Sequence, residues 1–370
     1  MRVCCALAPC LLALACADPG REGDASGQSA EGGISLSGSA SLDSGMDSAS
    51  DADAEAGDDG EKLDVGATGG MVDCPEGQIC DDCVEMEHTP CDGDSTDPFR
   101  AIGLNCPGTA EVQGTLDGSP MAIGLRVGFG STQQWAPREG SKFVVLGSGL
   151  VADLDIATPP GDLDVSPTHC NDDVGAFDPG PNLPAPLRTN DVGGDCTADA
   201  GLLGTGDCSN TIEGQFSQGV AANDYTEMRI VGQVPPSNNS ISYDLAFFSV
   251  EYPFYYGSQF NDMYVGWLES ESWTGNISFD EQGNPISLNA GFLDFRDDGG
   301  NRPEFAGTCM RQHAGTKWLN STAPVTPGEE ITVVFAIFDL SDSILDSYVF
   351  LDNFHWGCEG TDHPMTTPVG

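Results

Sequence analysis

Residues 331–350 read ITVVFAIFDLSDSILDSYVF, and they place two apolar runs on either side of a short segment of Asp and Ser. The first run, residues 331–338, is apolar almost throughout. A strand with one face in water alternates polar and apolar residues, whereas a strand covered on both faces reads as a continuous apolar run. The stretch therefore predicts a central, doubly covered strand at residues 331–338 and another strand at residues 348–354.

Short apolar runs between turn signals continue through most of the chain. Further strands are expected at residues 122–129, 142–146, 225–234, 242–250 and 263–268. Within residues 225–234, Met228 and Ile230 alternate with Glu227 and Arg229, as in a strand with one wet face. The 48 Gly and 24 Pro indicate a turn-rich chain, and no βαβ rhythm or internal repeat is present. We predict an all-β fold, an antiparallel β-sandwich of jelly-roll type with disulfide-stapled loops and a disordered N-terminal tether.

A second informative stretch, residues 247–264, reads FFSVEYPFYYGSQFNDMY and surrounds Glu251, Asn261 and Asp262 with aromatic side chains. Burying a charge costs several kcal/mol, on the order of 3 or more, unless it is partnered. These groups therefore either point to solvent at a strand end or bind something. The acidic segment after residue 338 has the same character, with Asp at three- and four-residue spacing. The candidate metal ligands from both stretches are Glu251, Asn261, Asp262, Asp339, Asp342 and Asp346.

Calcium is the cofactor that these candidates favour, because it prefers hard oxygen ligands from spaced carboxylates and amides. The two stretches could complete one site or form two. Residues 92–97, and Asp162 with Asp164, also look like acidic calcium-type loops. The alternative is a set of turns in which Asp and Ser side chains satisfy nearby backbone amides.

The chain carries 58 Asp and Glu against 13 Lys and Arg, for a formal net charge of −45. This charge excludes nucleic acid as a sequence-independent partner, because binding to phosphate needs Lys and Arg. It also argues against electrostatic docking on anionic lipid. The acidity fits either a solvated, self-repelling surface or carboxylates kept for divalent cations.

The N-terminus indicates export. Residues 1–15 read as a signal peptide whose apolar run is too short to span a bilayer. Small residues before Cys16 resemble a bacterial lipobox, which makes Cys16 the candidate lipidation site, with ordinary cleaved secretion as the alternative. Residues 16–73 are rich in Gly, Ser and acids, and they predict a disordered tether. We expect an extracytoplasmic protein that meets the membrane only through this lipid anchor, in the outer membrane of a Gram-negative bacterium.

Ten cysteines follow Cys16, and an even number in an exported chain favours up to five disulfides. They are Cys74, Cys80, Cys83, Cys91, Cys106, Cys170, Cys196, Cys208, Cys309 and Cys358. Two pairings are expected, Cys196 with Cys208 and Cys309 with Cys358. The alternative is a zinc site formed by Cys74, Cys80, Cys83 and Cys91 with His88. The expected segments are a Cys-rich cap at residues 74–106, the sandwich at residues 107–358 and a tail at residues 359–370.

Two motifs resemble the choice-of-anchor L family. Residues 248–262, FSVEYPFYYGSQFND, are similar to its SEEYPEY…NDxF signature, and residues 338–351, FDLSDSILDSYVFL, are similar to its IaDvgDxxyDSaVFl ending. The element GDLD at residues 161–164 looks like its GDxDL element. Val250 stands where the family has the first Glu of a pair, and Tyr348 where it has a small residue. The resemblance covers about residues 107–358 and implies an exported bacterial surface domain without an assigned activity.

The aromatic side chains leave two interpretations open. Tyr and Trp on a sandwich face or rim give platforms for sugar rings, but such residues also pack in cores. The residues concerned are Tyr252, Phe254, Tyr255, Tyr256, Trp267 and Trp273. No histidine has metalloprotease spacing and no serine sits in a hydrolase elbow, although Glu251 and Asp262 could form a glycosidase pair. We expect a non-enzymatic, calcium-stabilised adhesion or binding domain for a surface glycan or protein; the alternatives are a structural surface component and a carbohydrate-active hydrolase.

Overall fold

The computed structural model describes residues 83–86, 88–156, 170–171, 174–175, 177–290 and 293–369. All of them belong to one unit, Gly70–Gly370. The expected signal peptide, Cys16, the tether, Cys74, Cys80 and the GDLD element lie outside the described residues. In the described part of the chain, no helix has the length and hydropathy that crossing a bilayer requires.

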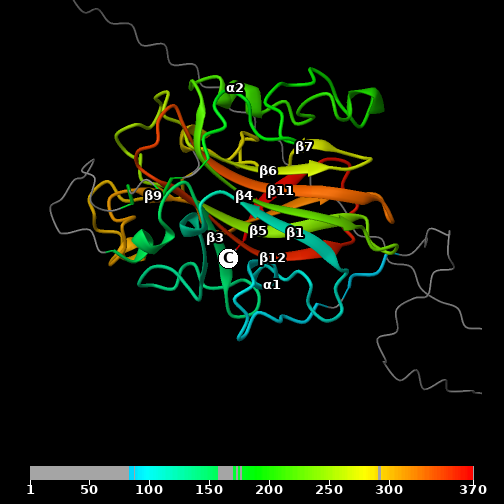
Figure 1. Cartoon of the computed structure of the whole chain (residues 1–370), viewed down its shortest axis with the longest axis horizontal. Coiled ribbons are helices and arrows are strands. Elements are labelled where there is room, and N and C mark those ends of the chain that lie inside the picture. Colours follow the sequence, from blue (N-terminus) through cyan, green and yellow to red (C-terminus); the bar gives the residue numbers. More distant parts are fainter. Residues whose placement is uncertain are drawn as a thin grey trace, which may run out of the picture. The chain divides into compact units, whose positions relative to one another are not determined.

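One sheet has five antiparallel strands with β11 in its centre (Figure 1). Their order is β1 (Val112–Asp117), β4 (Ala222–Gln233), β11 (Glu330–Leu340), β6 (Met263–Glu269) and β7 (Thr274–Asn276). The apolar run of residues 331–338 thus takes the central position that its sequence predicts.

The second sheet is also antiparallel, with β5 and β12 in its centre. Its order is β13 (Met365–Pro368), β10 (Leu319–Pro324), β5 (Ser240–Ser249), β12 (Ser347–Gly357), β3 (Phe143–Gly147) and β2 (Ile123–Arg126). The short strand β9 (Ala314–Gly315) pairs with both β5 and β8 (Phe295–Arg296). The all-β prediction is confirmed, and the jelly-roll connectivity stays a prediction.

Helical segments are short. The α-helices are α1 (Pro98–Ala101) and α2 (Ile212–Phe216), and the 3₁₀ turns are η1 (Pro120–Ala122), η2 (Val151–Asp155), η3 (Ala200–Leu202), η4 (Leu288–Ala290) and η5 (Pro303–Phe305).

The main core lies between the two sheets. The side chains of β5 alternate, so that Tyr243, Leu245 and Phe247 face the inter-sheet core, where Phe335 and Ile337 of β11 also lie. The rings of Tyr243 and Phe335 lie 4.6 Å apart. Each large apolar side chain buried here contributes about 1.5–3 kcal/mol relative to exposure.

Both sheets also bury part of their outer faces. Phe248 and Phe350, on the other face of β5 and β12, pack with Trp135 and Phe129 from the segment between β2 and β3. On the outer face of the five-stranded sheet, Phe338 packs with α2. This double coverage explains why β5 and β11 are buried along nearly their whole length.

The expectation of a wet face on β4 holds only in part, because Arg229 and Val231 are half-buried and Gln233 is exposed, but Glu227 is not. Glu227 is buried, accepts a hydrogen bond from the hydroxyl of Tyr225, and forms an ion pair with Arg229. Arg229 also donates to the carbonyl of Ala185, in a loop that covers this face of the sheet. An alternating sequence pattern shows which face of a strand is polar, but it does not show whether a loop covers and buries that face.

Four disulfides join described residues: Cys83–Cys358, Cys91–Cys106, Cys170–Cys309 and Cys196–Cys208. The pairing of Cys196 with Cys208 agrees with the expectation. The pairing of Cys309 with Cys358 is wrong, because Cys358, directly after β12, bonds Cys83, while Cys309 bonds Cys170 in the core on the outer face of the second sheet. Cys83 and Cys91, which the zinc alternative needs as ligands, are each joined in a disulfide and cannot bind zinc as thiolates.

Candidate functional site

Two inter-sheet connections meet at one end of the sandwich. Residues 250–262 lead from β5 to β6, and residues 341–346 lead from β11 to β12. Since β5 pairs with β12 and β6 pairs with β11, the two connections must start and finish side by side. The register places Ser249 opposite Ser347 and Met263 opposite Phe338. Both informative stretches of the sequence therefore converge.

The two-residue period of the strands directs specific polar side chains into the end of the core. Phe247 and Ile337 face the inter-sheet core, and so by the same period do Glu251 and Asp339 at the ends of their strands. Asp262 stands in the same relation to Tyr264 of β6. A register irregularity in the pairing of β11 with β4 falls between Ile337 and Asp339, but the extra residue lies on β4, so β11 keeps its two-residue period.

The result is a carboxylate cluster, by which we mean Glu251, Asp262, Asp339 and Asp342. Glu251 and Asp339 are each 1% exposed, Asp262 is fully buried and Asp342 is half-buried. Asp262 accepts hydrogen bonds from the backbone N–H of Leu340 (3.2 Å) and the hydroxyl of Ser347 (2.6 Å).

Four oxygens of the carboxylate cluster are buried without a hydrogen-bond partner. They are both carboxylate oxygens of Asp339, Oε2 of Glu251 and Oδ1 of Asp342. None of the ion pairs between described residues includes a cluster carboxylate. An unsatisfied buried acceptor costs about 1–3 kcal/mol, and more when charged.

Burial and mutual repulsion govern the ionisation of the cluster. Burial raises the pKa of Glu251 to about 11, and the charges of Asp262 and Asp342 add to this. Burial also raises the pKa of Asp262 to about 7, opposed by its bonds from Ser347 and Leu340. The pKa of Asp339 lies well above its usual range, from burial first and then from Asp262. A carboxyl in low dielectric beside other carboxyls resists losing its proton.

The other two expected ligands lie nearby but have partners. Asp346 accepts a hydrogen bond from the hydroxyl of Tyr348 at 2.9 Å. Asn261 uses both amide atoms, accepting from the N–H of Asn289 and donating to Gln215. All six expected residues therefore share one region, but only the carboxylate cluster offers unpartnered oxygens. Among the residues described, no three acidic, imidazole or thiol groups already surround one point as a metal would require.

The acidic loop at residues 92–97 binds the side chain of Lys142, and not a metal ion, in this structure. The ammonium of Lys142 donates to the backbone carbonyls of Asp92, Gly93 and Ser95, at 2.6–3.1 Å. The carboxylate of Asp92 accepts from the N–H and hydroxyl of Ser141. A side-chain cation thus takes the position expected for calcium. Asp162 and Asp164 lie outside the described residues.

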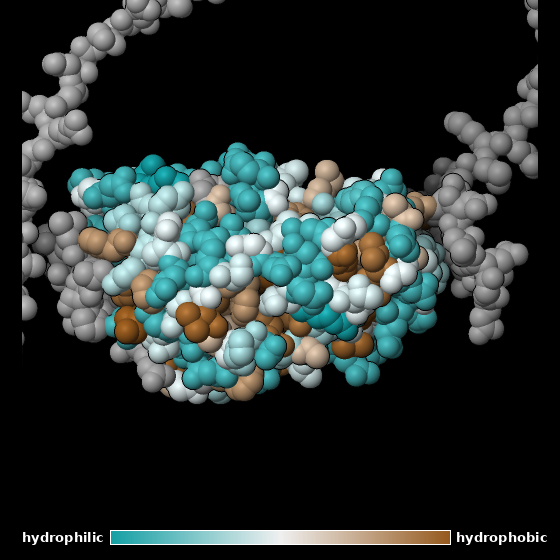
Figure 2. Space-filling model, turned by 90° about the horizontal axis from the view of Figure 1, so that it is seen from above, coloured by the Kyte–Doolittle hydropathy of each residue, from teal (hydrophilic) through white to brown (hydrophobic). Residues whose placement is uncertain are grey.

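Above the carboxylate cluster, residues 253–260 form a rim loop. Phe254 is 52% exposed and Tyr256 is 42% exposed. The guanidinium of Arg296 lies 5.4 Å from the ring centre of Tyr256. Figure 2 shows that exposed hydrophobic side chains form small patches on a largely hydrophilic face. The rim loop thus places two exposed aromatic side chains close together in the chain.

Amide side chains hold the rim loop from beside it. Asn289 accepts from the N–H of Gly257 at 2.6 Å and donates to the carbonyl of Ser258 and to Gln218. The other expected platform residues do not reach the surface: Tyr252, Trp267 and Trp273 are buried, and Tyr255 is half-buried. They pack in the cores, which leaves Phe254 and Tyr256 as the exposed rings.

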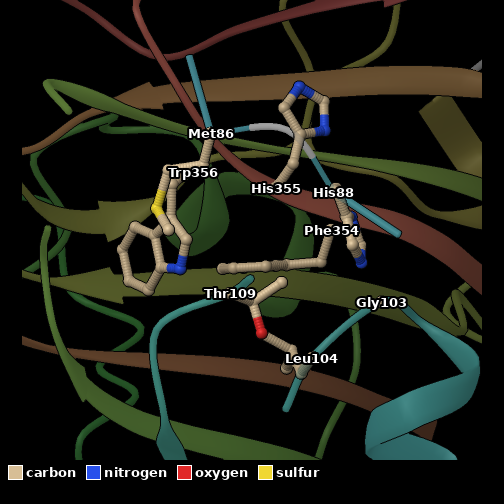
Figure 3. A pocket seen from close by; sticks show the side chains of 8 residues that line it. All are labelled: Met86, His88, Gly103, Leu104, Thr109, Phe354, His355 and Trp356. Carbon is tan, nitrogen blue, oxygen red and sulfur yellow. The ribbon is translucent and has the colours of Figure 1, made fainter. Parts of the chain in front are cut away.

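A pocket of about 250 Å³ lies away from this end, lined by Glu85, Met86, His88, Glu139, Asn353, His355 and Trp356. Figure 3 shows the adjoining cavity beside it, with His88 and His355 on different chain segments. Nδ1 of His88 lies 3.1 Å from Oε2 of Glu139. Sequence reasoning missed this pocket, because a disulfide-held segment and a bulge in β12 assemble residues that are far apart in the chain.

Comparisons with known proteins give one finding. Residues 199–355 match the family model described as Choice-of-anchor L domain. The match begins before β4 and ends within β12, so it includes both connections that form the carboxylate cluster. No curated protein and no solved structure matches the chain. A domain of this family indicates a protein associated with the cell surface.

Proposed function

We propose that this chain, which carries a Choice-of-anchor L domain at residues 199–355, is an exported surface protein that binds a surface glycan or protein without catalysis. One observation carries the proposal. The rim loop exposes Phe254 and Tyr256, while Glu251 and Asp262, which flank the loop on either side, are buried. An exposed aromatic surface on a fixed loop is suited to recognition, because little loop entropy is lost on binding.

The chemistry of the rim loop favours a glycan. Aromatic rings pack against the C–H faces of sugars, and the bonds from Asn289 to Gly257, Ser258 and Gln218 hold the loop that carries these rings. Arg296 adds a charged donor next to Tyr256. Tyr and Arg are also enriched at the centres of protein interfaces, which keeps a surface protein as the other ligand.

The hydrolase alternative has less support. Glu251 and Asp262 are buried under the rim loop, whereas a glycosidase needs two carboxyl groups that flank a substrate bond. The family is not known for catalysis. A structural component without a small ligand remains the other alternative, and the binding test below separates the two.

The sequence supports anchoring at the N-terminus. In this proposal, residues 1–15 are removed and Cys16 is lipidated, which holds the protein at the outer membrane of a Gram-negative bacterium. Metabolic labelling with a clickable palmitate tests the anchor. The wild-type chain should incorporate label and Cys16→Ser should not; equal labelling of the two would contradict the anchor.

Binding can be tested with the full chain on a glycan array and on intact bacterial cells. Wild-type protein should bind, and the double variant Phe254→Ala/Tyr256→Ala should lose about tenfold or more in affinity. Met121→Ala, which truncates an exposed side chain outside the rim loop, is the matched control. Equal melting temperatures would show that the variants fold.

Cell treatments identify the ligand class. Periodate should abolish binding to a glycan, and protease should abolish binding to a surface protein. A wild-type chain that binds neither cells nor array, or a double variant that binds as well as wild type, would refute the proposal and favour the structural alternative.

A further inference from the structure

We infer that the carboxylate cluster of Glu251, Asp262, Asp339 and Asp342 is a divalent-cation site, and that calcium is its ion. The inference deepens the proposed function, because Glu251 and Asp262 bracket the rim loop, but the evidence for the ion comes from the buried oxygens alone. Calcium at this position would make presentation of Phe254 and Tyr256 depend on the ion.

The first argument is charge. Four carboxyl groups converge at one end of the core, and no Lys, Arg or His among the described residues forms an ion pair with them. Like charges held close together in a buried, low-dielectric region repel strongly. Such a group exists only if protons or a cation neutralise it. A folded surface domain at neutral pH would have to hold several protons there in the absence of an ion.

The second argument is the set of unpartnered oxygens. Asp339 is 1% exposed, yet neither of its carboxylate oxygens makes a hydrogen bond of normal geometry, although Ser148 and the carboxyl of Asp262 are its neighbours. Oε2 of Glu251 is likewise buried without a hydrogen bond. Most buried polar atoms in folded proteins have a partner, and an exception points to a missing ion or water. Protonation would supply one donor per carboxyl, whereas one cation could satisfy all four oxygens together.

The third argument concerns the choice of ion. The unpartnered atoms all belong to carboxylates, and calcium takes six to eight oxygen ligands in flexible geometry at roughly 2.4 Å. Zinc and copper favour nitrogen and sulfur ligands, which the carboxylate cluster does not supply. Magnesium demands a tighter octahedron than groups on two separate connections readily form.

The turn that carries Asp342 fits this assignment. Ser341 and Leu345 have φ angles of 89° and 73°, in the left-handed region that side chains other than glycine rarely adopt. Such a conformation is unfavourable unless the surroundings enforce it. The two residues lie on either side of Asp342 in the chain. The ionised carboxylates repel one another, so we expect a cation to draw Asp339, Glu251 and Asp342 closer together.

Calorimetric titration of the full, chelator-stripped chain tests the site directly. Calcium should bind, should raise the melting temperature, and should do both more strongly than magnesium. Asp339→Asn should weaken calcium binding by about tenfold or more, since it removes one carboxylate without changing side-chain volume. Asp94→Asn, in the exposed acidic loop beside Lys142, is the matched control and should bind calcium like wild type.

The melting temperature without calcium distinguishes loss of a ligand from loss of the fold. Without calcium, Asp339→Asn should melt no lower than wild type, because it relieves repulsion. No calcium binding by wild type, or wild-type affinity in Asp339→Asn, would overturn the inference and leave protons as the neutralising species. Glycan binding is scored separately. A chain that binds calcium but no glycan or cell refutes the proposed function and leaves the cation site standing.

Discussion

The hydroxyl of Ser347 donates a 2.6 Å hydrogen bond to Oδ2 of Asp262, although 85 positions separate the two residues in the chain. Ser347 begins β12 of one sheet, and Asp262 immediately precedes β6 of the other. Both groups are fully buried. The bond therefore joins the two layers at the end where the carboxylate cluster lies.

Ser347→Ala should lower the free energy of unfolding by about 1–3 kcal/mol, because it leaves an oxygen of Asp262 buried without that donor. Urea denaturation in chelator measures the loss. Ser343→Ala, at an exposed position four residues earlier, should change stability by less than about 0.5 kcal/mol. Equal stability of the two variants would show that the Ser347 bond adds nothing.

Truncation of Phe248 should be among the costliest single changes. Its ring packs 4.4 Å from that of Phe350 and 4.9 Å from that of Trp135, and it is fully buried. Phe248→Ala should cost about 3–5 kcal/mol through lost contacts and the cavity it leaves. Phe254→Ala, in the same segment but half exposed, should cost much less. A similar loss in both variants by chemical denaturation would contradict the packing described for β5.

Removal of the Cys83–Cys358 disulfide should destabilise the fold. The bond closes a loop across a separation of 275 residues, and the chain-entropy model gives about 4 kcal/mol or more for loops beyond 100 residues. Cys196–Cys208 spans 12 residues, for which the same model gives about 3 kcal/mol. Paired Ala variants of each bond, compared by thermal melting, should follow this order. The reverse order would indicate that the N-terminal segment contributes little once it is docked.

Acid should weaken the fold through His88. Burial, and then the neighbouring His355, lower the pKa of His88 below 6.5, while Glu139 lies beside it. The folded protein therefore binds this proton less tightly than the unfolded chain. The stability that comes from a neutral His88 is complete above pH 6.5 and is lost as the pH falls toward the folded pKa.

His88→Gln removes this contribution, so its stability should fall less than that of wild type between pH 7.5 and pH 5. Glu139 acts in the opposite sense, since burial raises its pKa and stability declines as it ionises. The difference between wild type and variant isolates His88. Parallel pH profiles for the two proteins would contradict the assignment.

Much of the fold could be predicted from local pattern. Every strand expected from an apolar run is present, and the doubly apolar run of β11 is central. The missed strands have few apolar residues. In β1, only Val112 is buried, and β10 contains polar residues and ends at Pro324. These residues are extended because they pair with a neighbouring strand, and the sequence of one segment alone does not reveal its pairing partner.

The candidate site could be predicted in part. Acidic residues among aromatic ones pointed to Glu251, Asp262 and Asp339, because such a mixture is costly unless it has a use. The sequence does not show that these residues converge, because this depends on how the two connections cross between the sheets. It also does not show which of the aromatic side chains are buried in the core and which are exposed in the rim loop. The 92–97 loop could not be interpreted from its own sequence either. The cation that its carbonyl oxygens bind is the ammonium of Lys142, which lies about 50 residues away in the chain.

The bond between Cys83 and Cys358 also decides how this surface domain carries mechanical load. Tension applied to the chain ahead of Cys83 passes through a covalent link to the end of β12, which has neighbours on both sides in its sheet. The load would therefore reach a strand that is paired on both sides, with β3 and with β5, and not a segment held by surface contacts alone.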